Sequence, residues 1–278
     1  MVNNMHFSNL VKSAELNPHK ELLKIEQYLY HDTWVNETTL KDYINRSFPF
    51  FSINVRGSAV DLNNLMDEIG LTQSLLKGTT WENFWLYAEL LCNVLHQLCI
   101  CRKNERDNRF VDKQTNAIMG NIQYVANIQG FSIKQDQNDI YFIFSQDEVV
   151  DQVAKNIENK DVAWNLIKYK HSSLKGNLIA KKQILTLLYP LLEQSKDQVN
   201  GKAPYITIHN DASFLLNQCN IRHTPTAQSI KDATDVELEE WYDIAYETTI
   251  FALYGVQHSR HADKIKALKS ELKGVCDK

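Results

Sequence analysis

One segment in the first half of the chain limits the possible folds more than any other. Residues 79–107 read "TTWENFWLYAELLCNVLHQLCICRKNERD" and predict one long helix, which Thr79 and Glu82 would begin at capping-box spacing. Apolar residues recur on one face and occupy most other sides as well. A helix that is apolar almost all round has to be enclosed by other helices. The segment therefore predicts a central helix within a bundle.

Turn-forming residues are too few for a fold of many strands. Glycine occurs 9 times and proline 5 times in 278 residues, whereas average usage of the two together is roughly 12%. A β-sandwich or barrel needs a turn about every 8–12 residues. We therefore expect a mainly α protein made of helical bundles, with one small β-hairpin or short β-sheet in the middle of the chain.

The hairpin is expected where the apolar period changes from helical to alternating. The polar run "QDQND" separates two short alternating stretches, Phe131 with Ile133 and Ile140 with Phe142 and Phe144. Two strands alone are marginally stable. The hairpin should therefore lie on helices or pair with residues 50–55, within a stretch at 48–57 that we expect to be extended.

The hairpin is also the expected border between two helical units. We place an N-terminal unit at residues 1–130, and the hairpin followed by a C-terminal unit at 131–278. Helical periodicity fills the rest of the chain, at 19–31, 37–47, 59–77, 111–128, 146–171, from Leu178 to a kink or end at Pro190, from Asn210 or Asp211 to His223, and at 235–272. Residues 199–204 have the composition of a linker.

Charge and cysteine content exclude several classes of protein. The net charge of −4 gives no bulk attraction to nucleic acid or to an anionic membrane, although a local basic surface remains compatible with it. We see no signal peptide and no run of about eighteen apolar residues, so we expect a cytoplasmic protein without a membrane span. The five cysteines form no Cys-x-x-Cys pair, and Cys92 and Cys99 share a helix face. Buried, reduced thiols are expected rather than disulfides or zinc.

The sequence also lacks the common motifs of cofactor and metal sites. A phosphate-binding loop, a dinucleotide fingerprint, a nucleophile elbow and a zinc-protease motif are all missing, so we expect no cofactor. His258 and His261 lie three residues apart on a predicted helix and could share a metal ion. Because no third ligand is obvious nearby, we interpret them as part of a solvated helix face and predict no metal site.

The strongest functional lead is "NQCNIRHTPT", residues 217–226. Arg222 and His223 stand where an apolar run stops, just before Thr224 and Pro225. A structural interpretation is available, since cations at the C-terminal end of a helix gain about 0.3–1 kcal/mol from the helix dipole. Proline shortly after is also a normal stop signal.

A functional interpretation comes from the order of elements around this stretch. An apolar helix ends in "NIRH", a polar loop follows, and a long helix begins with "DVELEEWYDIAYETTIFALYG". This order, over residues 205–272, resembles the C-terminal part of HEPN-superfamily proteins, which are small four-helix domains. Many of these are ribonucleases of toxin and phage-defence systems, and others are non-catalytic. Their motif is Arg, then Asn, Asp or His, then several residues, then His.

The resemblance implies that Arg222 and His223 are catalytic residues, but half of the motif is missing. The distal histidine should fall at 227–229, where the chain has Ala227, Gln228 and Ser229. His223 itself could act as acid or base. His258 and His261 lie about 30 Å further along the final helix and could approach Arg222 only across a dimer.

A second candidate is the basic cluster "KYKHSSLKGN". Lys168, Lys170, His171 and Lys175 could bind an RNA backbone, with Tyr169 among them. The alternative is that Ser172 or Ser173 caps the next helix and that the lysines are ordinary surface residues.

Two functions remain open from the sequence. The first is a helical protein of a phage-defence or toxin-type system, acting as a dimerising module that binds nucleic acid or a partner protein. The alternative is a metal-independent HEPN-type endoribonuclease that uses Arg222 and His223. RNA, a second copy of the chain and a partner protein are the expected partners, and a membrane is not.

Overall fold

The computed structural model describes residues 16–33, 37–71, 79–102, 109–225 and 227–276. The chain divides into two compact units, Met1–Gln146 and Asp147–Lys278. The described residues are mainly helical and hold one two-stranded antiparallel sheet in the middle of the chain, which confirms the expected fold class. The division falls after the hairpin, so the hairpin belongs to the N-terminal unit and not to the start of the C-terminal one, where the sequence placed it.

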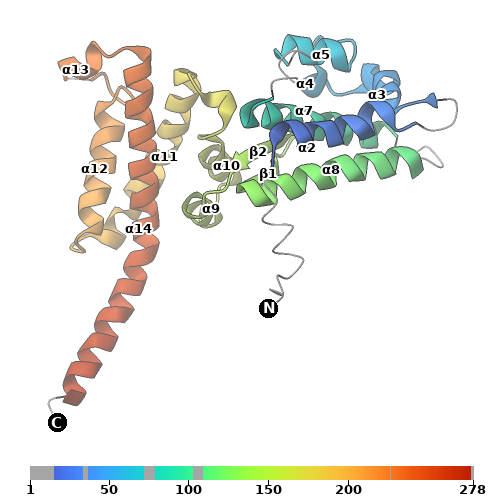
Figure 1. Ribbon diagram of the computed structural model, residues 1–278. Coiled ribbons are helices and arrows are strands. Elements are labelled where there is room, and N and C mark those ends of the chain that lie inside the picture. The colour runs from blue at the N-terminus through green and yellow to red at the C-terminus, as the bar shows by residue number, and fades with distance from the viewer. Residues whose placement is uncertain (1–15, 34–36, 72–78, 103–108, 226, 277–278) are drawn as a thin grey trace. The chain divides into compact units, whose positions relative to one another are not determined.

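The N-terminal unit is a set of helices packed around α7 (Figure 1). Its main elements are α2 (Pro18–Glu26) with a π-helical turn η1 (Gln27–His31), α3 (Leu40–Ser47), η3 (Phe48–Phe50), α4 (Ile53–Arg56), α5 (Leu62–Glu68), α7 (Trp81–Cys101), α8 (Arg109–Gln129), β1 (Phe131–Gln135) and β2 (Tyr141–Ser145). The helix expected at 59–77 is described only as α5, because residues 72–78 lie outside the described part of the chain.

Helix α7 is the central helix that its sequence predicted. It contacts α2, α3, α8 and β2, and its buried residues include Phe84, Tyr87 and Leu91. It begins one residue later than the capping-box spacing suggested, because Thr80 is the cap and its hydroxyl accepts from the Asn83 N–H. By length and composition α7 is apolar enough to cross a membrane, since the mean hydropathy of an 18-residue stretch within it is 1.3. However, 61% of that stretch is buried inside the protein. Such burial is typical of a core helix.

The stretch at 48–57 is helical, so the expectation of an extended segment was wrong. Pro49 lies in the first turn of η3, and Ser52 caps α4 by accepting from the Asn54 N–H. Phe48 and Phe51 are buried with their ring centroids 5.2 Å apart. These aromatic residues anchor two short turns to the core. Buried aromatic residues at such spacing also occur in strands, so the local sequence does not distinguish the two structures.

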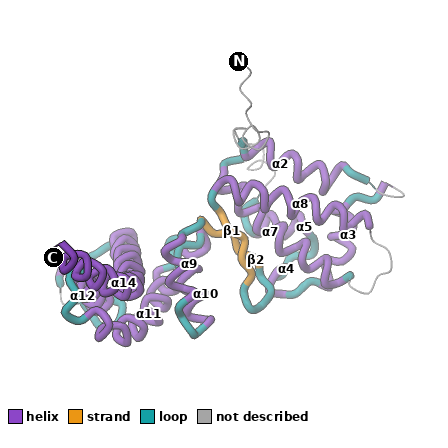
Figure 2. The backbone as a smooth tube through the Cα atoms, turned by 90° about the horizontal axis from the view of Figure 1, so that it is seen from below, coloured by secondary structure: helices purple, strands orange, loops and turns teal. Residues whose placement is uncertain are grey.

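The hairpin lies against α7 and α8, as its marginal stability required (Figure 2). Strand β2 pairs with β1 on one side, and α7 supplies hydrogen-bonding partners for it. The Asn93 Oδ1 accepts from the Tyr141 N–H at 2.8 Å, and its Nδ2 donates to the Tyr141 carbonyl at 2.9 Å. Glu89 accepts from the Ile143 N–H at 2.7 Å. Side chains of a helix thus take the place of a third strand.

The C-terminal unit is built around three long helices that pack on one another. Its elements are α9 (Glu148–Lys155), α10 (Lys160–Lys168), η4 (Ser172–Leu174), α11 (Leu178–Val199), α12 (Tyr205–Gln218), α13 (Gln228–Lys231) and α14 (Asp235–Cys276). Helices α11 and α14 run in the same direction, and α12 runs antiparallel to both. The predicted capping box at Thr234 and Glu237 is present at the start of α14.

Of the two alternatives expected at Pro190, an end of the helix is wrong. Helix α11 continues through Pro190, which lies on its exposed side, because Leu185, Leu188 and Leu192 hold the flanking turns in the core. A second expectation for this unit was also wrong. Helix α12 begins at Tyr205 and not at Asn210 or Asp211, so the expected linker at 199–204 is a loop between two packed helices.

The four cysteines whose side chains the structure describes, Cys92, Cys99, Cys101 and Cys219, are free thiols. Cys92 is buried, and burial raises the pKa of its thiol to about 12. Cys99 is exposed, although it was expected to be buried on the same helix face as Cys92. The residues of the last turn of α7 are less buried than those before them.

Candidate functional site

The loop after α12 holds Arg222 and His223 at the surface of the C-terminal unit. The helix ends at Gln218, and Asn220 turns the chain with a φ of 58°. Ile221 and Pro225 are buried on either side of the dipeptide. These two apolar anchors fix the loop, so that Arg222 and His223 between them are exposed to solvent.

The Arg222 side chain is held in place by two neighbours. Its guanidinium carbon lies 3.5 Å from the centre of the Tyr189 ring on α11. Its Nη1 donates to the Asn217 Oδ1 at 2.9 Å. A guanidinium has five N–H donors, and within the described part of the chain this is the single hydrogen bond that the Arg222 side chain makes. Arg222 is therefore a positioned cation that keeps most of its donors for an external acceptor such as a phosphate.

A second cation lies beside this loop. The Lys182 Nζ is 3.5 Å from the Asn220 Oδ1, and Lys182 stands two helical turns before Tyr189 on the same face of α11. We call Lys182, Tyr189, Asn217, Asn220 and Arg222 the Arg222 surface. It combines two positive charges with an aromatic ring and amide groups. Side chains of these kinds bind RNA backbones and bases.

His223 has no partner of the kind that acid–base catalysis needs. Its side chain makes no hydrogen bond or ring contact with any other residue the structure describes. The position of the missing distal histidine is taken by α13. His258 forms a 2.9 Å hydrogen bond with the Tyr205 hydroxyl at the opposite end of α12. That helix has 14 residues, a length of about 21 Å at 1.5 Å per residue, so within one chain His258 does not reach Arg222.

His258 and His261 lie together but hold no recognisable metal site. Their ring centroids are 5.9 Å apart. Among the described residues no group of three or more His, Cys, Asp or Glu side chains could hold a metal ion.

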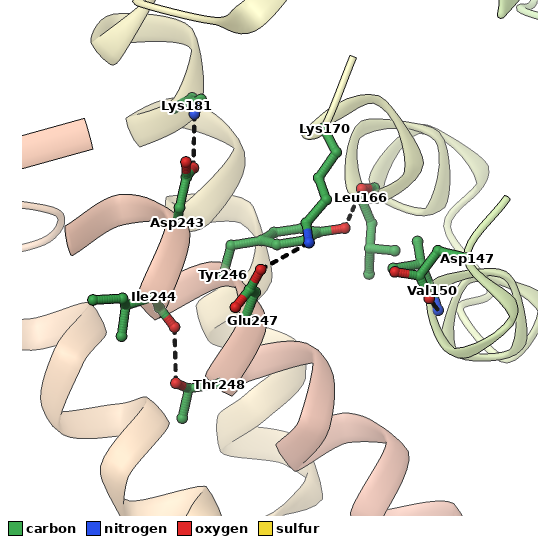
Figure 3. A network of polar contacts seen from close by, with 10 residues as sticks. All are labelled: Asp147, Val150, Leu166, Lys170, Lys181, Asp243, Ile244, Tyr246, Glu247 and Thr248. Atoms are coloured by element: carbon green, nitrogen blue, oxygen red, sulfur yellow. Dashed lines mark hydrogen bonds and ion pairs between the residues drawn. The ribbon is translucent and has the colours of Figure 1, made fainter. Parts of the chain in front are cut away.

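Part of the lysine cluster is occupied by contacts within the unit. Lys170 forms a 2.8 Å ion pair with Glu247 of α14 and lies over the Tyr246 ring (Figure 3). His171 is buried, and its Nδ1 accepts from the Ser173 N–H as the cap of η4. Neither Ser172 nor Ser173 caps the next helix, α11, because Asn177 is its cap and accepts from the Ala180 N–H.

The same cluster borders a cavity that also carries negative charge. The cavity has a volume of about 470 Å³, and its wall includes Lys170, Lys175 and Lys181 together with Glu239, Glu240, Asp243 and Glu247 of α14. Lys168 does not line it. Because the carboxylates offset the lysines, the cavity is a poorer phosphate site than the sequence of its basic side suggested.

The buried ion pair at this cavity was not predicted from the sequence. Lys181 is 5% exposed, and its Nζ lies 2.8 Å from Glu239 and 2.7 Å from Asp243. Figure 3 shows the contact with Asp243. Glu239 also accepts from the Gly176 N–H at 2.7 Å, and these contacts lower the pKa of Glu239. The two acids stand at i and i+4 on α14, a spacing that could have been noticed, but nothing local pointed to Lys181 as their partner. This network ties α11 to α14.

Two stacked tyrosines lie beside the ion pair. The rings of Tyr169 and Tyr246 are 4.0 Å apart and 4° from parallel. The Tyr246 hydroxyl donates to the Leu166 carbonyl at 2.8 Å (Figure 3). Burial raises the pKa of both hydroxyls. Tyr169, which the sequence grouped with the basic cluster, is therefore a core residue.

Comparisons with known proteins identify no related family, protein or structure. A scan against protein-family models finds no match. Searches of curated proteins and of solved structures find no match either.

Proposed function

We propose that the C-terminal unit is a dimerising nucleic-acid-binding module of a cytoplasmic phage-defence or toxin-type system, and that Arg222 makes its central contact with RNA. One observation carries the proposal. Arg222 is exposed, is fixed by Tyr189 and Asn217, and directs unused N–H donors to solvent. The half motif that resembles HEPN proteins supports the same assignment.

The physical basis is preorganisation of a cation. A free arginine side chain loses rotamer freedom when it binds a phosphate, and this cost offsets part of the affinity. Stacking on Tyr189 restricts the guanidinium before binding. A planar, restricted fork suits the two oxygens of a phosphate. The lysine cluster is not included in this surface, because Lys170 is paired with Glu247 and because four carboxylates of α14 line the cavity beside it.

Binding to a labelled single-stranded RNA tests the proposal directly. Fluorescence anisotropy would compare the unchanged protein with Arg222→Ala and with Arg260→Ala. Arg260 is a matched control because it is exposed and bonded to one amide, Gln198, at 2.9 Å. We expect Arg222→Ala to weaken binding about three- to tenfold and to reduce the salt slope by about 1, with little change for Arg260→Ala. Equal affinities in all three proteins would refute the Arg222 surface, and no RNA binding at all would refute the module.

A second candidate is metal-independent RNA cleavage, and the exposed neighbour His223 favours it. A histidine beside a phosphate-bound arginine could act as base and take the proton of the attacking 2′-hydroxyl, or act as acid and give a proton to the leaving 5′-oxygen. Incubation of RNA with the protein in EDTA tests this candidate. Cleavage that is lost in both Arg222→Ala and His223→Ala would support an endoribonuclease. Intact RNA, or cleavage that survives both substitutions, would leave binding as the function.

A further inference from the structure

The last part of α14 leaves the bundle and continues without covering helices. Near the end of the bundle, α14 is still held by hydrogen bonds of Arg260 with Gln198 of α11 and of His258 with Tyr205 of α12. Figure 1 shows α14 running on past the ends of α11 and α12 within this unit. From Lys264 to Glu271 every residue is exposed. This stretch and its continuation to Cys276 we call the α14 tail.

The α14 tail carries an apolar stripe that a solitary helix does not need. Ile265 is 48% exposed and Leu268 is 56% exposed. In the sequence, Leu272 and Val275 continue the stripe with spacings of three and four residues, and His258 and His261 precede it. The pattern is a heptad repeat, in which His258, Ile265 and Leu272 take position a. His261, Leu268 and Val275 take position d. A seam of this kind is buried against another helix with the same spacing.

We propose that the α14 tail pairs with the α14 tail of a second copy of this chain as an antiparallel two-stranded coiled coil. The inference rests on the self-association in the proposed function and names its surface, but it does not depend on RNA binding. In this arrangement Ile265 packs against Leu268 of the second copy, and Leu268 packs against its Ile265.

Charge decides between the two possible directions. Lys264 and Glu271 occupy successive g positions, and Lys269 occupies an e position. In an antiparallel pair g positions face g positions, so Lys264 meets Glu271 of the second copy at two symmetric places. In a parallel pair g faces e, so Lys264 meets Lys269. The antiparallel direction gives attraction where the parallel direction gives repulsion.

The length and attachment of the tail suit such a pair. Lys264 to Cys276 spans 13 residues, or about 20 Å at 1.5 Å per residue. An isolated helix of this length is marginal in water. Here the bundle holds the preceding turns of α14 in helical form, so part of the cost of nucleation is already met. An antiparallel pair also keeps the two bundles at opposite ends of the seam, where they do not collide.

Molar mass in solution tests the surface. Size-exclusion chromatography with light scattering, at protein concentrations up to about 100 µM, would compare the full chain with Ile265→Asp/Leu268→Asp. We expect the unchanged chain to be a dimer and the double variant a monomer. The helical circular dichroism signal of the double variant should fall by no more than the share that the tail contributes. Lys266→Glu alters charge at an outward b position and should remain dimeric. A monomeric unchanged chain, or a dimeric double variant, would overturn the proposal, and the latter would direct attention to Trp241, Ile244 and Phe251 on the bundle.

A charge exchange tests the direction. Lys264→Glu and Glu271→Lys should each weaken the dimer about tenfold, because each places like charges at both symmetric contacts. The double variant Lys264→Glu/Glu271→Lys should restore the affinity. Stronger association of Lys264→Glu alone would indicate the parallel pair and overturn the antiparallel one. RNA binding by the monomeric variant, measured separately, shows whether the Arg222 surface works without the seam, so failure of one proposal is distinguishable from failure of the other.

Discussion

The guanidinium carbon of Arg222 lies 3.5 Å from the centre of the Tyr189 ring. The two residues come from different elements, since Tyr189 is on α11 and Arg222 is on the loop after α12. The ring covers one face of the guanidinium and leaves its edge, where the N–H groups point, to solvent. A helix dipole alone would attract a cation to this end of α12 but would not restrict its orientation. The stacking is therefore the feature that distinguishes this arginine from an ordinary charged helix end.

Removal of the ring should weaken RNA binding while the charge of Arg222 stays in place. A cation–π contact at an exposed site contributes about 0.5–1 kcal/mol, so we expect Tyr189→Leu to lower RNA affinity about two- to fivefold. Tyr189→Phe keeps the ring and should bind like the unchanged protein. Fluorescence anisotropy with the same RNA measures both. Equal losses in the two variants would show that the hydroxyl, and not the stacking, matters.

Loss of the buried cation at Lys181 should destabilise the C-terminal unit. In Lys181→Met the carboxylates of Glu239 and Asp243 lose their shared partner. Their side chains are 21% and 46% exposed, so water compensates in part, and we expect a loss of about 2–3 kcal/mol in the free energy of unfolding.

The matched control is Lys170→Met, which breaks the neighbouring ion pair with Glu247. In that pair the Lys170 side chain is 44% exposed and the Glu247 side chain is 53% exposed. That change should cost less than about 1 kcal/mol. Urea unfolding of the full chain, followed by circular dichroism, measures both variants. Similar losses in the two would mean that burial of Lys181 contributes little to the stability of the ion-pair network.

The same network should make stability depend on pH in the acid range. The Lys181 ammonium and the Gly176 N–H lower the pKa of Glu239 below its ordinary value of 4.5. When folding lowers the pKa of a carboxyl, the ionised carboxylate adds to the free energy of unfolding. This contribution is complete at pH values above the unfolded-state pKa and is lost as the pH falls through the folded-state pKa. We expect the unchanged protein to lose more stability than Glu239→Gln between about pH 5 and pH 3. Parallel pH profiles of the melting temperature would contradict the assignment.

The features that the sequence predicted correctly depend on neighbours along the chain. The helical stripe of α7, the alternating residues of the hairpin, and the Thr234–Glu237 capping box are all set by contacts within a few residues. Periodicity and capping chemistry report such contacts directly. The hairpin was predicted in the right place, although its attachment to α7 could not be located from its own residues.

The features that the sequence missed depend on contacts between distant segments. Phe48 and Phe51 belong to a segment of strand-like composition, but the segment forms two short helical turns in which Phe48 begins the first and Phe51 follows it, and both side chains are buried. Lys181 looks like a surface lysine until α14 places two carboxylates beside it. The dipeptide Arg222–His223 was found, but its support by Tyr189 was not, because nothing near either residue predicts the approach of α11 to this loop.

The attachment of the hairpin to α7 gives the last prediction. Asn93 accepts from the Tyr141 N–H and donates to the Tyr141 carbonyl, so a single side chain satisfies both backbone groups of that residue. Asn93→Ala leaves these groups without a partner. We expect a loss of about 1–3 kcal/mol in the stability of the N-terminal unit, since unsatisfied backbone groups at a partly buried site are costly.

Hydrogen exchange separates this effect from a general loss of stability. The amides of Tyr141 and Ile143 should exchange faster in Asn93→Ala, while amides in the middle of α14, in the other unit, should keep their protection. Asn127→Ala serves as the control, because Asn127 is exposed on α8 and bonded to one surface glutamine, Gln123. If Asn93→Ala and Asn127→Ala exchange alike at Tyr141, water replaces the asparagine without cost and the hairpin is held by its apolar contacts, such as the 4.5 Å stacking of Phe131 on Trp85.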